Sequence, residues 1–246
     1  MPTREYQALQ LDTRTHFTDK LWLGGSWTIQ LKNHGDFEGE AANQPGNAEL
    51  FGSYPEILVR ERHFPYGRLN EFQRHKVRIY TSYNLGLGPF GSLDLSPMWR
   101  IDSGRTYSLE AVGVAHPPAL LAKNPGYLRT AAAGQSANVF FGERGSQDFK
   151  GYGVLDFATN YSIPLWQELR PWIQVQVFNV FNNQKLIQWN TSVTPDAAGP
   201  VDANGLPTQY IEGASFGEAT GANHYVGWLP WETGGRTYRV AFGIRF

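Results

Sequence analysis

The sequence has no cysteine in its 246 residues, so it holds neither a disulfide framework nor a thiolate metal site. An excess of charge of one sign is also missing. The 21 basic and 22 acidic side chains leave a formal net charge of -1, which excludes a strongly basic nucleic-acid-binding protein. Long hydrophobic runs are absent as well, because no stretch approaches the roughly 18 apolar residues of a membrane-spanning helix. Strands of an outer-membrane barrel escape this last test, since half of their residues are polar.

What the sequence does contain is alternation with a period of two residues, seen most clearly in its last ten residues, TYRVAFGIRF. The apolar positions of this segment are Tyr238, Val240, Phe242, Ile244 and Phe246. The positions between them include Arg239 and Arg245. Successive side chains of a β-strand point to opposite faces, so this segment predicts a strand with one face in an apolar medium and the other in a polar one.

Six further segments alternate in the same way and predict an antiparallel sheet of about seven strands. They are residues 9–17, 21–32, 76–85, 92–102, 154–163 and 172–183. Pro97 cannot donate to a strand ladder, so we expect a bulge or a missing hydrogen bond at that position. The alternation also blurs at Phe178 and Asn179, where we expect a second irregularity.

The connections between these segments alternate strictly between short and long. The short ones lie around residues 18–20, 86–91 and 164–171, and the long ones cover roughly 33–75, 109–151 and 184–236. This rhythm is typical of an outer-membrane barrel, which has tight periplasmic turns and long extracellular loops. It places Phe246 at the periplasmic side. Aromatic residues near the turns predict an interfacial girdle; they are Phe17, Trp22, Tyr83, Phe90, Tyr161, Trp166 and Trp172.

The polar positions of the predicted strands carry charges of both signs, which predicts a hydrated lumenal face with cross-strand ion pairs. The residues that we expect to face the lumen are Arg78, Asp94, Arg100, Asp156, Arg239 and Arg245. The same alternation places Lys32 and Lys76 on this face. A merely solvated face would have the same pattern, and the sequence does not separate the two interpretations.

Two of the long connections combine arginine with aromatic residues, which are frequent in ligand contacts. The candidate extracellular ligand contacts are Arg60, Arg62, Tyr66, Tyr225, Trp228 and Trp231. An equally good interpretation is that these side chains pack the loops against one another and against the barrel rim.

The sequence offers little sign of catalysis, and we expect neither an enzyme, a cofactor nor a metal. The six histidines form no closely spaced ligand pair, and the stretch from His34 to Asp36 is better read as a turn than as a weak metal site. No nucleophile elbow or phosphate-cradling glycine loop is present. Ser26 and His16 share the polar face and keep a hydrolytic pair open as a remote alternative.

Several motifs resemble those of TonB-dependent outer-membrane receptors, especially the Oar-like branch. VQVFNVFNNQKL resembles the penultimate-strand motif of these receptors through Asn179, Phe181 and Asn182. WRIDSGRTYS resembles a strand end with a Ser-Gly-x-Thr/Pro-Tyr run in the same receptors, through Ser103, Gly104 and Tyr107. The terminal Phe246 with its alternating apolar residues is similar to the signal read by the barrel-assembly machinery. The resemblance follows the chain in order over most of its length.

The resemblance implies an all-β fold, an antiparallel meander of about seven transmembrane strands within a larger barrel of about 22 strands. Residues 1–246 would be its C-terminal fragment, without a plug domain, and the opening stretch MPTREYQALQLD shows no secretory signal peptide. The implied function is TonB-dependent uptake at the bacterial outer membrane. The implied partners are outer-membrane lipid, the barrel-assembly machinery, the missing barrel and plug, and indirectly the TonB system. The alternative from another class is a secreted soluble β-domain that binds glycans through aromatic loop residues.

Overall fold

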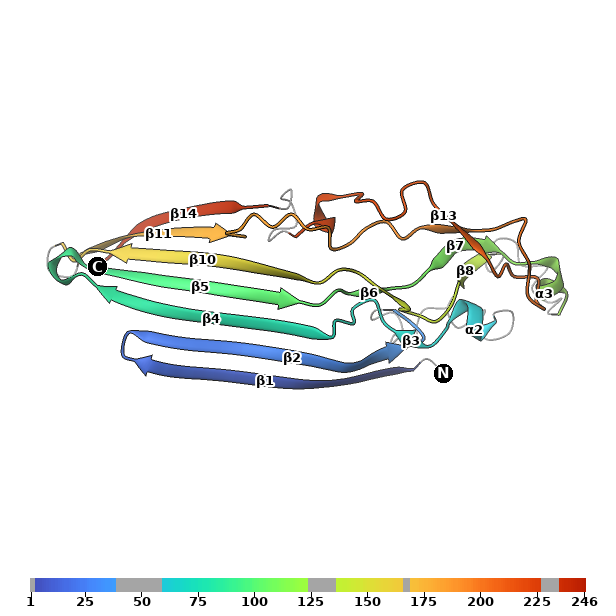
Figure 1. Cartoon of the computed structure of the whole chain (residues 1–246), viewed down its shortest axis with the longest axis horizontal. Helices are drawn as coiled ribbons and strands as arrows, with labels where there is room; N and C mark the ends of the chain where they lie inside the picture. Colours follow the sequence, from blue (N-terminus) through green and yellow to red (C-terminus); the bar gives the residue numbers. More distant parts are fainter. Residues whose placement is uncertain (1–2, 39–58, 124–135, 166–168, 227–234) are drawn as a thin grey trace.

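The computed structural model describes residues 3–38, 59–123, 136–165, 169–226 and 235–246. It is all-β and is built around one large antiparallel sheet, in which seven long strands follow one another in chain order (Figure 1). These strands are β1 (Arg4–Thr18), β2 (Leu21–Gly35), β4 (His75–Gly86), β5 (Ser92–Asp102), β10 (Tyr152–Ser162), β11 (Arg170–Phe178) and β14 (Thr237–Arg245). The predicted all-β meander is therefore confirmed, whereas barrel closure and membrane embedding stay predictions.

Cross-strand register sorts the side chains into two faces, because residues directly opposite each other in an antiparallel pair point to the same side. Ile79, Trp99 and Leu155 lie opposite one another across β4, β5 and β10. In the adjacent row, Arg78 lies opposite Arg100. The alternation read from the sequence is thus reproduced as one apolar and one polar face.

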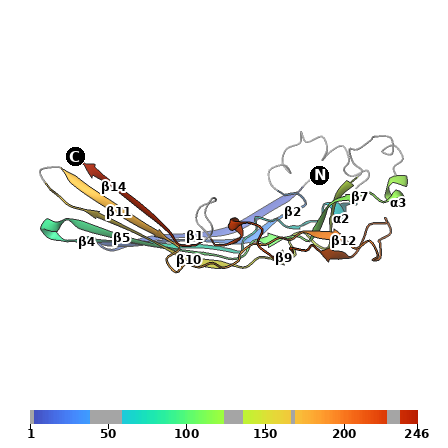
Figure 2. The same cartoon turned by 90° about the horizontal axis from the view of Figure 1, so that it is seen from above.

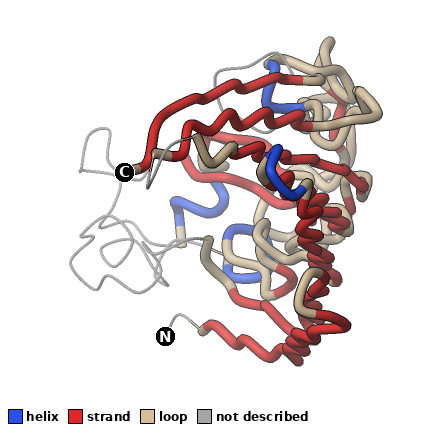
Figure 3. The backbone as a smooth tube through the Cα atoms, turned by 90° about the vertical axis from the view of Figure 1, so that its left-hand side faces the viewer, coloured by secondary structure: helices blue, strands red, loops and turns tan. Residues whose placement is uncertain are grey.

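The short and long connections lie at opposite ends of the sheet (Figure 1). The turn after β1, the turn after β4 with its 3-10 helix η2 (Gly88–Phe90), and the connection after β10 lie at the same end as the C-terminus. The predicted rhythm is therefore present in space. Viewed from this turn end, the seven strands follow an arc (Figure 3).

The apolar face of the sheet is exposed. Phe242 has 83% of its surface accessible, Trp99 has 48% and Ile79 has 43%. Other exposed members of this face are Leu9, Leu11, Leu23, Trp27, Tyr83, Leu85, Ile101, Ile173, Tyr238, Val240 and Ile244. Within the described residues, these side chains are not sealed beneath a second sheet or a helical layer.

None of the described helices is long and apolar enough to cross a membrane.

Three irregularities modify the ladder, and one of them is a register shift of β1 between His16 and Thr18, next to the turn. At Pro97 the register of β4 with β5 continues unchanged, but the pairs Thr81–Pro97 and Ser82–Ser96 are missing from the ladder, as expected for a residue without an N–H. A β-bulge between Gln7 and Ala8 shifts the β1–β2 register, so Ala8 lies opposite Gln30 and Gln7 lies opposite Lys32. The bulge turns Lys32 to the opposite face from the one that we predicted, because the alternation changes phase there.

Shorter elements extend the sheet at its loop end, where Figure 2 shows them beyond the long strands. β3 (Gly67–Arg68) pairs with β2, and three two-stranded sheets form nearby. These are β6 (Thr106–Tyr107) with β9 (Gln147–Asp148), β7 (Glu110–Ala115) with β8 (Ser136–Phe140), and β12 (Val193–Pro195) with β13 (Tyr210–Glu212). The helices are α2 (Arg60–His63), α3 (Pro118–Ala122) and the 3-10 helix η4 (Ala222–His224).

This loop layer, as we call the described residues that connect the long strands at that end, contains most of the buried apolar side chains. They include Leu69, Phe72, Leu109, Ala111, Leu120, Val139, Phe140, Val193, Leu206 and Val226. The long connections are therefore folded, with a small core of their own. Apolar burial in the described part of the molecule is concentrated here rather than on the sheet.

The predicted aromatic girdle is divided between the two faces. Phe90 is 72% exposed at the turn, and its carbonyl oxygen accepts a hydrogen bond from the Tyr161 hydroxyl at 2.7 Å. Trp22 and Trp172 instead lie opposite Ser82 and Ser162, which places both tryptophans on the polar face. Trp166 lies outside the described residues.

Candidate functional site

Two arginine–aspartate pairs bridge neighbouring strands on the polar face at its loop end. Arg78 donates to both oxygens of Asp102, at 2.6 and 3.0 Å, and Arg100 donates through Nε to Asp156 at 3.0 Å. Both carboxylates are about 6% exposed. Each pair joins diagonal neighbours on adjacent strands, the geometry in which long side chains reach one another.

Asp94 lies near the turn end of the same face and is held by amides. Asn84 donates to Asp94 Oδ1 at 2.6 Å, and Asn160 donates to Oδ2 at 3.4 Å. These three residues lie on β4, β5 and β10, so one carboxylate links three strands. Arg78, Asp94, Arg100 and Asp156 therefore share the face that the sequence predicted. Whether this face lines a lumen stays a prediction.

The two arginines of the last strand lie over aromatic rings. The guanidinium carbon of Arg239 is 5.5 Å from the ring centre of Phe178, and that of Arg245 is 5.8 Å from the ring centre of Trp172. Register places Arg239 opposite Gln176 and Trp172 opposite Gly243. A guanidinium at this distance is attracted to the electron-rich face of the ring.

The motif around Asn179 ends β11 and ties it to β10. Asn179 is 2% exposed and adopts φ 54°, a left-handed conformation that asparagine tolerates. Its backbone N–H donates to Asp156 at 2.8 Å, and its side chain both donates to and accepts from the backbone of Asn183. Asn183 in turn donates to the carbonyl of Gly153 at 3.0 Å. The irregularity predicted at this point is thus a strand end, not a bulge.

The second motif, around Ser103, joins the ends of β4 and β5. The Ser103 hydroxyl accepts the backbone N–H of His75 at 3.0 Å, and its carbonyl accepts from the Gln73 side chain at 3.0 Å. A Cβ at Gly104 would lie 1.7 Å from the carbonyl oxygen of Phe149, so only glycine fits there. Tyr107 packs against Phe149, with ring centres 4.5 Å apart. Both motifs therefore stabilise the rim of the sheet at its loop end.

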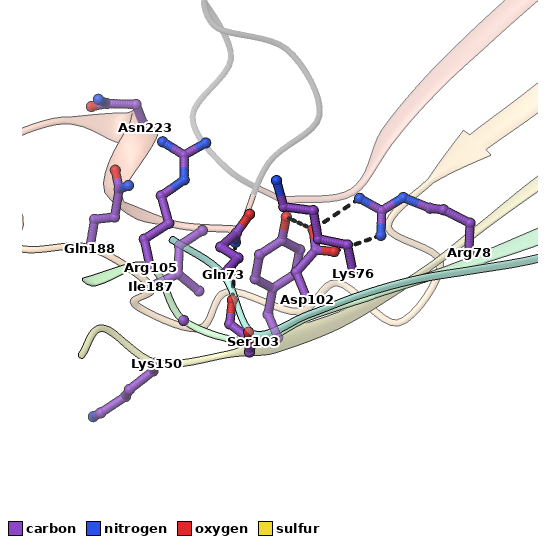
Figure 4. Close-up of a pocket in the computed structure, with 12 residues that line it drawn as sticks. Gln73, Lys76, Arg78, Asp102, Ser103, Arg105, Lys150, Ile187, Gln188 and Asn223 are labelled. Atoms are coloured by element: carbon purple, nitrogen blue, oxygen red, sulfur yellow. Dashed lines mark hydrogen bonds and ion pairs between the residues drawn. The ribbon is translucent and has the colours of Figure 1, made fainter. Parts of the chain in front are cut away.

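A cavity of about 390 Å³ opens between this rim and the loop layer. It is bounded by the ends of β4, β5 and β10 and by the segment that follows β11 (Figure 4). Its lining residues are Gln73, Lys76, Arg78, Asp102, Ser103, Gly104, Arg105, Lys150, Tyr152, Ile187, Gln188 and Asn223. The sequence placed Lys76 and Arg78 on this face but did not identify Arg105, which follows the Ser-Gly pair and carries no periodic signal.

The predicted loop contacts are mostly engaged in packing. Arg62 forms an ion pair with Asp202 at 2.9 Å and donates to two backbone carbonyl oxygens. Arg60 forms an ion pair with the fully buried Asp36 at 2.9 Å. Tyr66 donates to Glu5 at 3.0 Å. Tyr225 is 39% exposed.

These contacts fit the packing interpretation of the loop residues, and their role toward a ligand stays a prediction. Trp228 and Trp231 lie outside the described residues.

The C-terminal strand exposes the residues that we predicted as an assembly signal. Tyr238, Val240, Phe242, Ile244 and Phe246 are all exposed, and Phe246 reaches 94%. They lie on the apolar face of β14, which pairs with β11 alone in the described part of the chain. A free strand edge with an apolar face is the geometry that a partner strand or lipid would cover.

The described residues contain no group of three histidine, aspartate or glutamate side chains arranged to hold a metal ion. Ser26 lies opposite Asp12, whereas His16 lies opposite Trp22. His16 is four residues beyond Asp12 along β1, roughly 13 Å at the usual strand rise. The hydrolytic pair considered from the sequence is therefore not assembled.

Comparison of the chain with models of known families, with curated proteins and with solved structures finds no match.

Proposed function

We propose that the chain forms part of the wall of a β-barrel in the bacterial outer membrane, as a segment of a TonB-dependent receptor that takes up a solute. One observation carries this proposal. The described sheet exposes an apolar face along its length and lines its other face with ion pairs and amide contacts. Transfer of apolar surface from water to hydrocarbon is favourable by roughly 25 cal/mol per Å². Hydrocarbon is therefore the environment that suits this face.

The edges of the sheet support a larger barrel. Among the described strands, β1 pairs only with β2 and β14 pairs only with β11. Unpaired backbone groups cost several kcal/mol each in hydrocarbon, so both edges call for partner strands. Neighbouring strands run in opposite directions, so the first and the last of the seven, β1 and β14, run in the same direction. A barrel that is antiparallel throughout therefore needs an odd number of further strands between them. A barrel of about 22 strands adds about 15, which satisfies this parity.

The TonB-dependent class is supported by the two motifs that resemble those receptors. The Asn179 cluster joins β10 to the end of β11, and the Ser103–Gly104 segment joins β4 and β5. Both lie at the loop end of the polar face, where a receptor meets its solute. In this proposal the β14 side chains are read by the barrel-assembly machinery. In the same proposal the rest of the receptor supplies the plug, and the TonB system of the inner membrane drives uptake through that missing part.

The experiment that tests the proposal uses the absence of cysteine. Leu95→Cys reports on the apolar face, and the adjacent Ser96→Cys is its matched control on the polar face. The chain is refolded into phosphatidylcholine vesicles and treated with a water-soluble maleimide. We expect Ser96→Cys to react and Leu95→Cys to be protected, while a lipid-soluble maleimide reverses the order.

Equal reaction of both cysteines with the water-soluble reagent would contradict lipid contact. A chain that stays monodisperse without detergent would point instead to the soluble glycan-binding alternative.

A further inference from the structure

The cavity at the loop end of the polar face is lined by unequal numbers of positive and negative charges. Asp102 supplies its one carboxylate, and both oxygens of that group are already engaged, by Arg78 at 2.6 and 3.0 Å and by the Tyr152 hydroxyl at 2.8 Å. Lys76 and Arg105 have no ion-pair partner among the described residues, and neither has Lys150, whose side chain points away from the cavity in Figure 4. The cavity therefore faces two cations without an ion pair, Lys76 and Arg105.

The positions of these cations make them available to one ligand. Figure 4 shows Lys76 and Arg105 extending to the same side of the strands, with Gln73 between them, whereas Lys150 points away. Gln188 and Asn223 lie beside Arg105 in the same view. Ammonium, guanidinium and amide N–H groups are the donors that bind carboxylate or phosphate oxygens.

A second cavity continues the first along the polar face. It has a volume of about 300 Å³ and shares Gln73, Lys76 and Arg105 with it. Its other cation, Arg4, forms an ion pair with Glu71 at 3.2 Å. The two unpaired cations thus lie where both cavities meet, and together the cavities offer room for a solute larger than a single phosphate ion.

We propose that this cavity binds a small solute with at least two negative charges, carried by phosphate or carboxylate groups, through Lys76 and Arg105. The proposal rests on the receptor function above and names the class of solute that such a receptor would take. Arg78 and Asp102 form a neutral pair at the wall, and Tyr152 holds Asp102 in place. Lys76 and Arg105 provide the attraction.

The test measures binding of tripolyphosphate and of citrate to the full chain in neutral detergent micelles by isothermal titration calorimetry. The variants are Lys76→Gln and Arg105→Gln, which each remove one charge. Arg74→Gln is the matched control, because it makes the same change in a residue that lines a different cavity, with Leu31, His34 and Phe72. We expect each site variant to weaken binding about tenfold, the control to bind like the original chain, and added salt to weaken binding.

The outcomes separate this inference from the receptor function. Equal weakening by Arg74→Gln, or no binding of either probe, overturns the anion site while the cysteine-labelling test of lipid contact still stands. If the anion binds with the expected variant pattern but Leu95→Cys reacts with the water-soluble maleimide, the anion site is supported and the receptor function is contradicted. Preference for tripolyphosphate or for citrate distinguishes a phosphate from a carboxylate solute.

Discussion

The sheet and the loop layer solve the problem of apolar surface in opposite ways. The loop layer buries Leu69, Val139 and Leu206 almost completely. Its buried Asp36 and Arg144 form ion pairs with Arg60 and Glu38, which belong to the same layer. The sheet leaves residues such as Phe242 and Trp99 exposed on its apolar face and forms ion pairs on its polar face. The loop layer therefore carries its own core, whereas the sheet requires a partner environment for its apolar face. This difference predicts that the two regions respond to different changes.

The largest expected effect is on the loop layer alone. Arg144 is buried, donates to the backbone carbonyls of Pro65 and Asp36, and forms an ion pair with Glu38 at 3.0 Å. Arg144→Ala removes all three contacts and should cost about 3–5 kcal/mol of local stability. Hydrogen exchange should show faster exchange in the loop layer and little change in β4 or β5. Uniform loss of protection across both regions would show that they unfold together.

The next effect separates the faces of the sheet. Ile79→Arg places a charge on the apolar face and should destabilise the folded chain in a bilayer by about 2–4 kcal/mol. Ala158→Arg makes the same charge change on the polar face and serves as control, with an expected effect well below that of Ile79→Arg. Urea unfolding in vesicles, followed by tryptophan fluorescence, measures both. Equal destabilisation by the two variants would contradict the division into lipid-facing and water-facing sides.

A smaller effect is expected at the junction of the two regions. Asn179→Ala removes the hydrogen bonds of the side chain to Asn183 and places alanine at φ 54°. The combined cost should be about 2 kcal/mol. Asn182→Ala is the comparison, because it places alanine at φ 51° and removes only exposed hydrogen bonds, chiefly that from the Arg236 N–H at 3.0 Å. Chemical denaturation should show the larger loss for Asn179→Ala, and a smaller loss than for Asn182→Ala would remove the structural role assigned to the motif.

The smallest effect is a pH dependence confined to the loop layer. Burial lowers the pKa of His63 and of His116 below 6.5, and their rings lie 5.8 Å apart. The unfolded chain therefore binds protons more readily than the folded one. The loop layer has its full stability above about pH 6.5 and loses part of it as the pH falls from there toward the lowered pKa values. Hydrogen exchange of β7 and β8 at about pH 8 and pH 5 should detect the loosening. His63→Gln should reduce it, and a loop layer that gains protection in acid would contradict the sign.

The seven long strands were predictable because each carries a period-two pattern that its register preserves. Val77, Ile79 and Thr81 predict their face from sequence alone, and the structure places them on it. The predicted face of Lys32 was wrong because the register shift between Gln7 and Ala8 changes the phase of the alternation in β2. No glycine or proline marks this bulge in the sequence. Trp22 and Trp172 stand at polar positions of the alternation, and the structure keeps them there, so a girdle predicted from closeness to the turns is divided between the two faces.

The candidate site was predictable only in part. Arg78 and Arg100 were placed on the polar face by alternation, and their pairing with Asp102 and Asp156 follows from the register. Arg105 lies after the strand, where periodicity ends, so its meeting with Lys76 depends on how the loop segment folds back. Contacts such as that of Arg62 with Asp202 join residues 140 positions apart, which no local pattern encodes.

Lipid contact at the apolar face is tested most directly by quenching of tryptophan fluorescence with lipids brominated along their acyl chains. Trp27 and Trp99 lie exposed on the apolar face, whereas Trp22 and Trp172 lie on the polar face. We predict that the double variant Trp27→Phe, Trp99→Phe loses most of the quenching, while Trp22→Phe, Trp172→Phe keeps it. Undiminished quenching in the first variant, or none in the original chain, would contradict the lipid-facing sheet.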